Sequence, residues 1–172
     1  MGITLQLPKQ ETKTGWEGSP LLPLQQTNNQ HKGSFGTYVV KQVLEQKGVT
    51  CKVISDRGDL ETSKGRSEVK CAFSSHTGSG FQLWWNQVRP QQEGWELLHL
   101  VGFTPDSIMV WELTREQFLS LGEVFVKNGH VSGEEEGSLK EVKVRKNSKT
   151  DTVSLLNCFL VATIPASEVT IL

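Results

Sequence analysis

Two carboxylates and an amine are spaced for metal chemistry within residues 56–73, DRGDLETSKGRSEVKCAF. The glycine in residues 63–65 predicts a tight turn between two antiparallel strands. One strand begins at Asp59, and the other carries Glu68 and Lys70. Because side chains alternate between the faces of a strand, a loop with an even number of residues would pair Asp59 with Lys70 and place all three on one face. Carboxylates on one face, with apolar residues behind them, can hold a hard divalent cation beside a water molecule.

An acidic residue, a hairpin, Glu-x-Lys and a short apolar strand follow one another here, and this order resembles the PD-(D/E)xK nuclease superfamily, the fold of many restriction endonucleases. The resemblance covers residues 34–121. It implies that Asp59, Glu68 and the backbone carbonyl of Val69 bind Mg²⁺. Lys70 would orient or deprotonate the attacking water. The implied activity is Mg²⁺-dependent hydrolysis of phosphodiester bonds in double-stranded DNA at a specific sequence, as in type II restriction enzymes.

Three positions near this site leave alternatives open. Gly58 precedes Asp59, where the family pattern has a proline. Asp56 is a second candidate for the first metal ligand, and we favour Asp59 because it lies on the hairpin arm that faces Glu68. Some relatives add a glutamate from the helix before the sheet. Glu45 is the only candidate for that role, and a solvated side chain in the last helical turn explains it more simply.

A second segment of the resemblance lies in residues 81–89, FQLWWNQVR, which predict a strand. Relatives often carry Gln-hydrophobic-Arg after the Glu-x-Lys strand. The match implies that Gln87 stands near the metal and Arg89 near a substrate phosphate, whereas an arginine in water at the edge of a sheet is the alternative. We leave His76, in a predicted polar loop at residues 74–80, out of the catalytic set, because a lone loop histidine is usually a surface residue.

Residues 141–143 repeat the Glu-x-Lys tripeptide. No aspartate occupies a matching upstream arm, and the surroundings are charged, so residues 59–70 remain the preferred site. Five basic residues in the segment 140–149 form either a local phosphate-binding face or a solvated loop. The net charge of the chain is −1, so DNA binding needs such a local patch, or metal ions at the site, to neutralise phosphate.

The remaining pattern predicts an α/β fold, a restriction endonuclease-like mixed β-sheet flanked by helices. Ser34 is expected to cap the first helix, and Thr114 and Gln117 form a capping box at the second. Residues 1–33 predict an extended N-terminal arm, and residues 34–172 a single nuclease-like domain. The predicted helices are residues 34–47 and 114–121, and the predicted strands are residues 49–55, 81–89, 95–103, 107–112, 123–126 and 152–164.

Length and composition indicate the class of protein. The chain has 172 residues, of which 36% are hydrophobic, so it can bury one real core. Three widely spaced cysteines make neither a disulfide framework nor a zinc set, which predicts the cytoplasm, and no apolar run reaches the roughly 20 residues that a bilayer requires. One site cuts one strand, so duplex cleavage predicts a homodimer or a second nuclease subunit. A homing or repair nuclease, or a non-catalytic nucleic-acid-binding module on the same fold, is the alternative.

Overall fold

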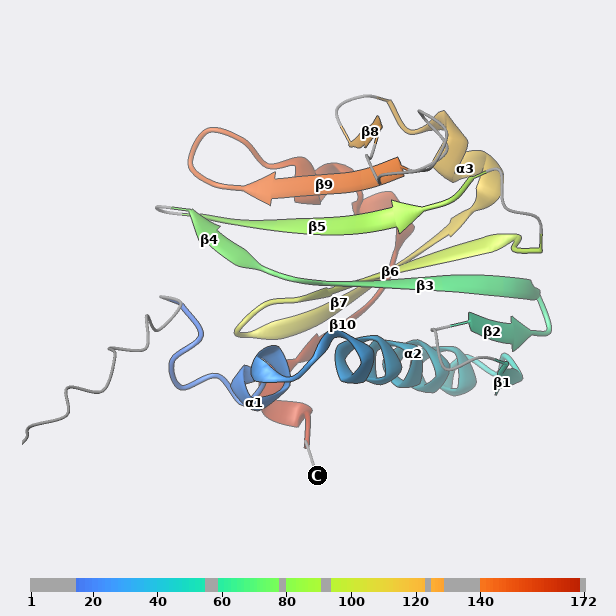
Figure 1. Ribbon diagram of the computed structural model, residues 1–172, viewed down its shortest axis with the longest axis horizontal. Helices are drawn as coiled ribbons and strands as arrows, with labels where there is room; N and C mark the ends of the chain where they lie inside the picture. The colour runs from blue at the N-terminus through green and yellow to red at the C-terminus, as the bar shows by residue number, and fades with distance from the viewer. Residues whose placement is uncertain are drawn as a thin grey trace, which may run out of the picture.

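Three layers make up the described part of the chain, which comprises residues 15–54, 59–77, 80–90, 94–122, 125–128 and 140–170 of a computed structural model. In Figure 1 a long helix forms the bottom layer, a six-stranded sheet the middle and a four-stranded sheet the top. The helices are α1 (Leu22–Gln26), α2 (Asn29–Gln46), α3 (Arg115–Ser120) and α4 (Thr152–Leu155), with the 3-10 turns η1 (Asn157–Phe159) and η2 (Ala166–Glu168). The strands are β1 (Cys51–Val53), β2 (Asp59–Thr62), β3 (Gly65–Phe73), β4 (Ser75–Thr77), β5 (Gly80–Val88), β6 (Leu97–Phe103), β7 (Ser107–Thr114), β8 (Val126–Asn128), β9 (Lys140–Lys146) and β10 (Leu160–Pro165).

The six-stranded sheet is mixed. Its described strands lie in the order β1-β2-β3-β6-β7-β10, where β3 and β6 run parallel and the other neighbours run antiparallel. The four-stranded sheet has the order β4-β5-β9-β8 and is antiparallel throughout. The chain passes from one sheet to the other at Ser74, which joins β3 to β4. The predicted mixed α/β class is confirmed.

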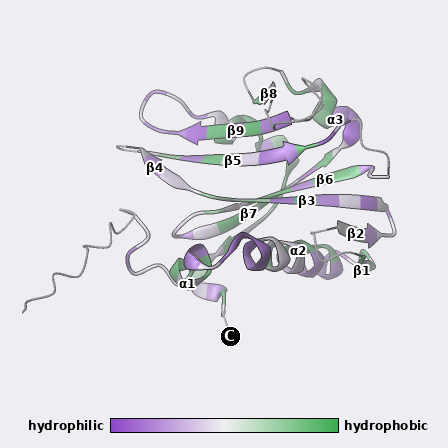
Figure 2. Ribbon diagram, in the orientation of Figure 1, coloured by the Kyte–Doolittle hydropathy of each residue, from purple (hydrophilic) through white to green (hydrophobic). Residues whose placement is uncertain are grey.

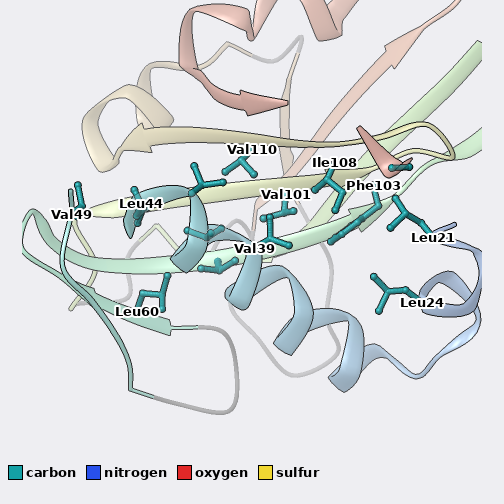
Figure 3. Packing of buried hydrophobic residues seen from close by; sticks show 14 of the residues in the cluster. Leu21, Leu24, Val39, Leu44, Val49, Leu60, Val101, Phe103, Ile108 and Val110 are labelled. Carbon is teal, nitrogen blue, oxygen red and sulfur yellow. The ribbon is translucent and has the colours of Figure 1, made fainter. Parts of the chain in front are cut away.

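The apolar stripe of α2 covers one face of the larger sheet. Its Val39, Val43 and Leu44 are almost completely buried and belong to the same cluster as residues of β2, β6 and β7. Figure 3 shows the stripe directed at Val101 and Val110. This spacing is the one expected of an amphipathic helix that packs on a sheet. The helix therefore forms the apolar backing of β3 on that side.

The N-terminus of α2 differs from the prediction. The helix begins at Asn29, so the predicted start with Ser34 as N-cap is wrong. The cap is Asn28, whose side-chain oxygen accepts a hydrogen bond from the backbone N–H of His31 at 2.9 Å. Polar residues fill the first turn, and they carry no apolar periodicity from which a helix could be predicted.

A glycine allows α2 to lie close to β3. A Cβ atom at Gly36 would overlap the Sγ atom of Cys71. Close by, the rings of Phe73 and Phe103 stack with centroids 4.4 Å apart. The backbone of α2 thus approaches the strand that carries Glu-x-Lys, which fixes the position of that strand in the layers.

The second core lies between the two sheets. Trp85 of β5 meets Trp111 of β7 edge to face at 5.5 Å, and its Nε1 donates a hydrogen bond to the carbonyl of Val101 at 2.9 Å. A Cβ atom at Gly102 would lie 2.6 Å from Cδ1 of Leu83, so β5 can cross β6 closely only at a glycine. These contacts hold the smaller sheet on the larger one.

Residues 15–33 are the described part of the predicted N-terminal arm. Trp16, Leu21 and Leu24 are buried in the core that lies between α2 and the larger sheet. The indole Nε1 of Trp16 donates a hydrogen bond to the carbonyl of Ser74 at 3.2 Å. This part of the arm is therefore packed onto the domain, and residues 1–14 lie outside the described residues.

Several other predicted elements are confirmed. Helix α3 begins with the predicted capping box, and β6 and β7 form the predicted hairpin. The strands β1 and β5 fall inside or near their predicted ranges, and β8 overlaps the last predicted residue of its range. No helix of the described residues is long and apolar enough to cross a membrane.

Two predicted elements are wrong, and for the basic segment the loop alternative is wrong. Residues 152–164 form α4, η1 and β10 instead of one long strand, because Asp151 caps a helix by accepting from the backbone N–H of Ser154 at 3.0 Å. Part of the predicted loop at residues 74–80 is β4, which pairs with β5. The basic segment contains β9, a strand that the charged residues concealed.

Candidate metal site on the β2–β3 hairpin

The hairpin places Asp59 directly opposite Glu68. Its loop consists of Ser63 and Lys64, so the prediction that Asp59 pairs with Lys70 is wrong. The true register differs from the predicted one by two residues, and a shift of two leaves every residue on the same face. Asp59, Glu68 and Lys70 therefore still occupy positions on one face of the hairpin.

The loop position is fixed by Thr62. Its hydroxyl donates to the carbonyl of Gly65 at 2.7 Å and accepts from the backbone N–H of Lys64 at 3.1 Å. Gly65 takes a φ of 125°, which a residue with a Cβ atom rarely adopts. The glycine consequently stands after the loop instead of inside it, which accounts for the difference in register.

Asp59 and Glu68 form a non-hydrogen-bonded pair, the kind in which opposite side chains stand closest. In β3, Arg66 directs its backbone away from β2: its N–H donates to a Glu96 carboxylate oxygen at 2.7 Å, and its carbonyl accepts from the Glu96 N–H at 2.9 Å. By alternation the backbone of Glu68 also points away from β2, and the carbonyl of Val69 points towards the edge of β3 on which β2 lies. The Cα atoms of such a pair are about 4.5 Å apart.

Glu68 and Lys70 form an ion pair on β3. The Nζ atom of Lys70 lies 2.6 Å from Oε1 of Glu68, and the side chains are 21% and 18% exposed, respectively, so both remain in reach of solvent. Glu68 and Lys70 share a face of β3 with Ala72, which packs between the two sheets. Val69 is on the opposite face and packs between the larger sheet and α2. Among the side chains that the structure describes, no three His, Cys, Asp or Glu lie close enough to hold a metal, and the Asp59 side chain lies outside that set.

A buried polar network backs the hairpin on the opposite face of β3. Ser67 Oγ and His99 Nδ1 are 2.6 Å apart, and both residues are completely buried. His99 Nε2 lies 3.1 Å from Oε2 of Glu112, whose Oε1 lies 3.2 Å from Nζ of Lys64. The network therefore ties the residue before Glu68 and the hairpin loop to β6 and β7.

This network controls the ionisation of Glu112. The hydrogen bond from His99 is the main cause that lowers the pKa of Glu112 from 4.5 to about 2; burial opposes the shift, and the ammonium of Lys64 supports it. A histidine inside an apolar run such as residues 95–103 is expected to be a satisfied core or edge residue, and His99 is completely buried with a partner at each ring nitrogen. Its partner was not predicted, although the hairpin turn at Pro105 sets His99 opposite Glu112.

Strand β5 runs over β6 towards the end of β3 that carries Glu68. Leu83 lies against Gly102, and Trp85 reaches the carbonyl of Val101. Later residues of β5 therefore lie over earlier residues of β6, which pairs in parallel with β3. The C-terminal end of β5 is directed towards the candidate site.

That end of β5 carries Gln87 and Arg89, and its backbone is unusual. Gln87 is the only non-glycine residue with a positive φ, 59°, in the described ranges, and the pairing with β9 is irregular between Trp85 and Val88. The side chain of Gln87 is exposed, and the carbonyl of Arg89 accepts a hydrogen bond from Trp95 Nε1 at 3.2 Å. A strained backbone held by its surroundings is a common feature of functional positions.

The other sequence candidates lie apart from the ion pair. Glu45, on α2 across the sheet, pairs with Lys41 at 2.7 Å and is exposed, as the simpler interpretation predicts. His76 is exposed on β4. Asp56 lies outside the described residues. A hollow of about 620 Å³ beside the hairpin loop is lined by Lys64 and other residues, but neither residue of the ion pair lines it.

The second Glu-x-Lys tripeptide lies in β9. Val142 is completely buried, so the expectation that this segment lacks an apolar backing is wrong. Glu141 is paired with Lys127 and Lys143 with Trp84, so neither position faces an acid across those pairs. Among the described residues, this tripeptide therefore has no carboxylate opposite it of the kind found in the β2–β3 hairpin.

Comparisons with protein-family models, with curated proteins and with solved structures find no match to this chain. The function is therefore argued from the geometry of the site.

Proposed function

We propose that the protein is a Mg²⁺-dependent endodeoxyribonuclease of the restriction type, with its catalytic site at Asp59, Glu68 and Lys70. The observation that carries this proposal is the register of the β2–β3 hairpin. It places one carboxylate residue directly opposite another, next to a lysine that already contacts Glu68 at 2.6 Å. Like charges directly opposite each other across a ladder are destabilising, and a bound cation would offset that repulsion.

The available donors fit Mg²⁺. Asp59 and Glu68 supply carboxylates at opposite positions, and the carbonyl of Val69 points to the edge where β2 ends. Hard oxygen ligands of this kind, with room for water, suit Mg²⁺ better than softer metals. When bound, Mg²⁺ polarises a phosphate and lowers the pKa of a coordinated water.

The side chains around this donor set have separate roles in the proposal. Lys70 orients the attacking water and holds positive charge beside the phosphate that is cut. We assign Gln87, which has the positive φ of 59°, to a place near the metal donors, and Arg89 to a neighbouring phosphate. The polar network beneath Ser67 keeps the hairpin in place.

The order of elements supports the same proposal. The helix α2, the strand β1, the acidic hairpin β2–β3 and then further strands, β4 to β7, occur in this order, and the resemblance to PD-(D/E)xK nucleases implies a helix, a strand, a hairpin and strands. A restriction endonuclease-like fold in the cytoplasm is thus part of the proposal. Because one site cuts one strand, we include pairing of two chains, or of this chain with a second nuclease subunit, on duplex DNA.

Cleavage of mixed plasmid and phage DNA tests the proposal. We expect discrete bands with wild-type protein and Mg²⁺, no cleavage in EDTA, and a loss on the order of 10³-fold for Lys70→Met. Lys52→Met, which removes an exposed lysine of β1, is the matched control and should cut like wild type. Folding of each variant is checked by circular dichroism.

Three results would change the assignment. If folded wild-type protein binds DNA but does not cut it, the result would favour the non-catalytic binding module. Cleavage by Lys70→Met at the wild-type rate would remove this hairpin as the site. Cleavage only at rare long sequences, or at damaged DNA, would point to a homing or repair nuclease with the same chemistry.

A further inference from the structure

The outer face of the four-stranded sheet differs in character from its inner face. The inward residues of β5 and β9 are apolar and completely buried; they are Leu83, Trp85, Val142 and Val144. Strand alternation turns their neighbours outward. There Trp84 is paired with Lys143, and Gln82 with Arg145. An aromatic and two cations therefore lie side by side on one surface.

Trp84 is the exposed tryptophan of the chain. All five tryptophans are among the described residues; Trp84 is 44% exposed, and the other four are at most 4% exposed. Packing of the sheets does not require an indole on the outer face, because Trp85 already fills the inner one. A large exposed aromatic of this kind is typical of a contact surface.

Positive charge is concentrated on the same strand. β9 holds four basic residues and one acidic residue, although the whole chain has a net charge of −1. Figure 2 shows hydrophilic colouring at both ends of β9 around an apolar centre. Such a local excess attracts phosphates even when the net charge does not.

The second tripeptide holds the indole in place. Lys143 Nζ lies 4.7 Å from the ring centroid of Trp84, and the indole Nε1 donates a hydrogen bond to Glu141 Oε2 at 3.2 Å. The hydrogen bond to Glu141 fixes the edge of the indole, so little conformational freedom of this side chain remains to be lost when a ligand stacks on it.

We infer that this face is an auxiliary DNA-binding surface, on which Lys143 and Arg145 bind phosphates and Trp84 stacks on an unpaired base. The inference rests on the proposed function, since it gives the proposed duplex-cutting nuclease a second contact surface, for unpaired DNA strands. The base takes the place of the Lys143 ammonium above the indole, and the ammonium moves to the adjacent phosphate. Basic grooves with exposed aromatics bind single-stranded nucleic acid in this way.

Tryptophan fluorescence tests the surface directly. Wild-type protein in EDTA, which prevents cleavage, is titrated with a single-stranded oligonucleotide of about 16 nucleotides and, separately, with its duplex. Because Trp84 is the exposed tryptophan, we expect the single strand to quench the emission and the duplex to quench it much less. Trp84→Phe should remove this quenching.

Charge variants test the phosphate contacts. Lys143→Gln and Arg145→Gln should each weaken single-strand binding on the order of fivefold at low salt and reduce the slope of log affinity against log salt by about 0.7. Lys52→Gln, an exposed lysine on β1, should bind like wild type. Binding of the single strand without quenching, or binding by both β9 variants with the affinity of wild type, would overturn the inference.

The outcomes separate this surface from the catalytic proposal. Glu68→Gln should bind the oligonucleotide like wild type while losing cleavage. If wild-type protein binds through Trp84 but cuts nothing, the proposed activity fails and the surface stands. If it cuts DNA but the β9 variants bind normally, the surface fails and the activity stands.

Discussion

The chain contains the same tripeptide twice, and the described residues opposite the two copies differ. Glu68-Val69-Lys70 lies in β3 and Glu141-Val142-Lys143 in β9, and both central valines are buried. The position opposite Glu68 is Asp59, whereas the position opposite Glu141 is Lys127.

The lysines of the two copies also differ. Lys70 makes an ion pair with the glutamate of its own tripeptide at 2.6 Å, and Lys143 lies over an indole. The tripeptide alone therefore does not define the chemistry. The residue across the ladder decides whether two carboxylates can share a cation.

The largest effect on cleavage is expected from Asp59, the residue that distinguishes the surroundings of the first tripeptide from those of the second. Asp59→Asn keeps the shape of the side chain and removes the second carboxylate, so we expect DNA cleavage to fall on the order of 10³-fold in Mg²⁺. Asp56→Asn is the matched control, because it changes the alternative acid three residues earlier, and it should retain activity. Initial rates on one plasmid substrate measure both. Loss of activity in the Asp56 variant alone would move the first ligand to that residue.

A smaller effect, on the free energy of unfolding, is expected from the buried residues that pack against each tripeptide. The first copy is backed by the buried Ser67–His99–Glu112 network and the second by an apolar core. His99→Leu leaves buried polar atoms without a partner and should lower the free energy of unfolding by about 2–4 kcal/mol. Urea denaturation of the single and double variants measures this.

The double variant supplies the control for that experiment. Ser67→Ala removes the hydroxyl that His99 contacts, so the cost of Ser67→Ala and His99→Leu together should be less than the sum of the single costs. Strict additivity of the two changes would mean that the network does not act as a unit.

The acid dependence of stability gives the smallest of the three effects. The pKa of Glu112 is about 2 in the folded protein and near 4.5 when the chain is unfolded. A depressed carboxyl pKa stabilises the fold above about pH 4.5, and this contribution is lost as the pH falls towards 2. We expect it to be on the order of 2–3 kcal/mol.

Denaturation curves between pH 6 and pH 2.5 measure this contribution. Glu112→Gln should reduce the slope in that window, whereas Glu141→Gln, on the second tripeptide, should leave the slope close to that of wild type. If the free energy of unfolding of Glu112→Gln depends on pH between 6 and 2.5 as it does in wild type, other groups control stability in acid.

Local chemistry made the candidate site largely predictable from sequence. Alternation in β3 predicts that Glu68 and Lys70 share a face, and an error of two residues in the register left the face unchanged. The exact partner of Asp59 was not predictable, because the Thr62 side chain, and not the glycine, sets where the loop closes. The positive φ of Gln87 coincides with the irregular pairing of β5 with β9 between Trp85 and Val88, a contact between distant segments that no local pattern indicates.

The errors in the fold have physical causes of the same kind. The apolar run at residues 152–164 fits a buried strand or a short helix, and the cap at Asp151 decides for the helix. In β9 the buried valines alternate with charged residues, so the segment resembles a solvated loop until its inner face is known. By contrast, the capping box of α3 is a purely local signal, and it was predicted correctly.

The most direct test of the central claim is a comparison of Glu68→Gln with Glu141→Gln in one cleavage assay at saturating DNA and Mg²⁺. Both variants remove one carboxylate from the same tripeptide and keep its shape. The hairpin assignment predicts that Glu68→Gln loses on the order of 10³-fold in rate, and that Glu141→Gln changes by no more than severalfold through the outer surface of the smaller sheet. Loss of cleavage in Glu141→Gln together with wild-type rates in Glu68→Gln would contradict the assignment and place the metal site on β9.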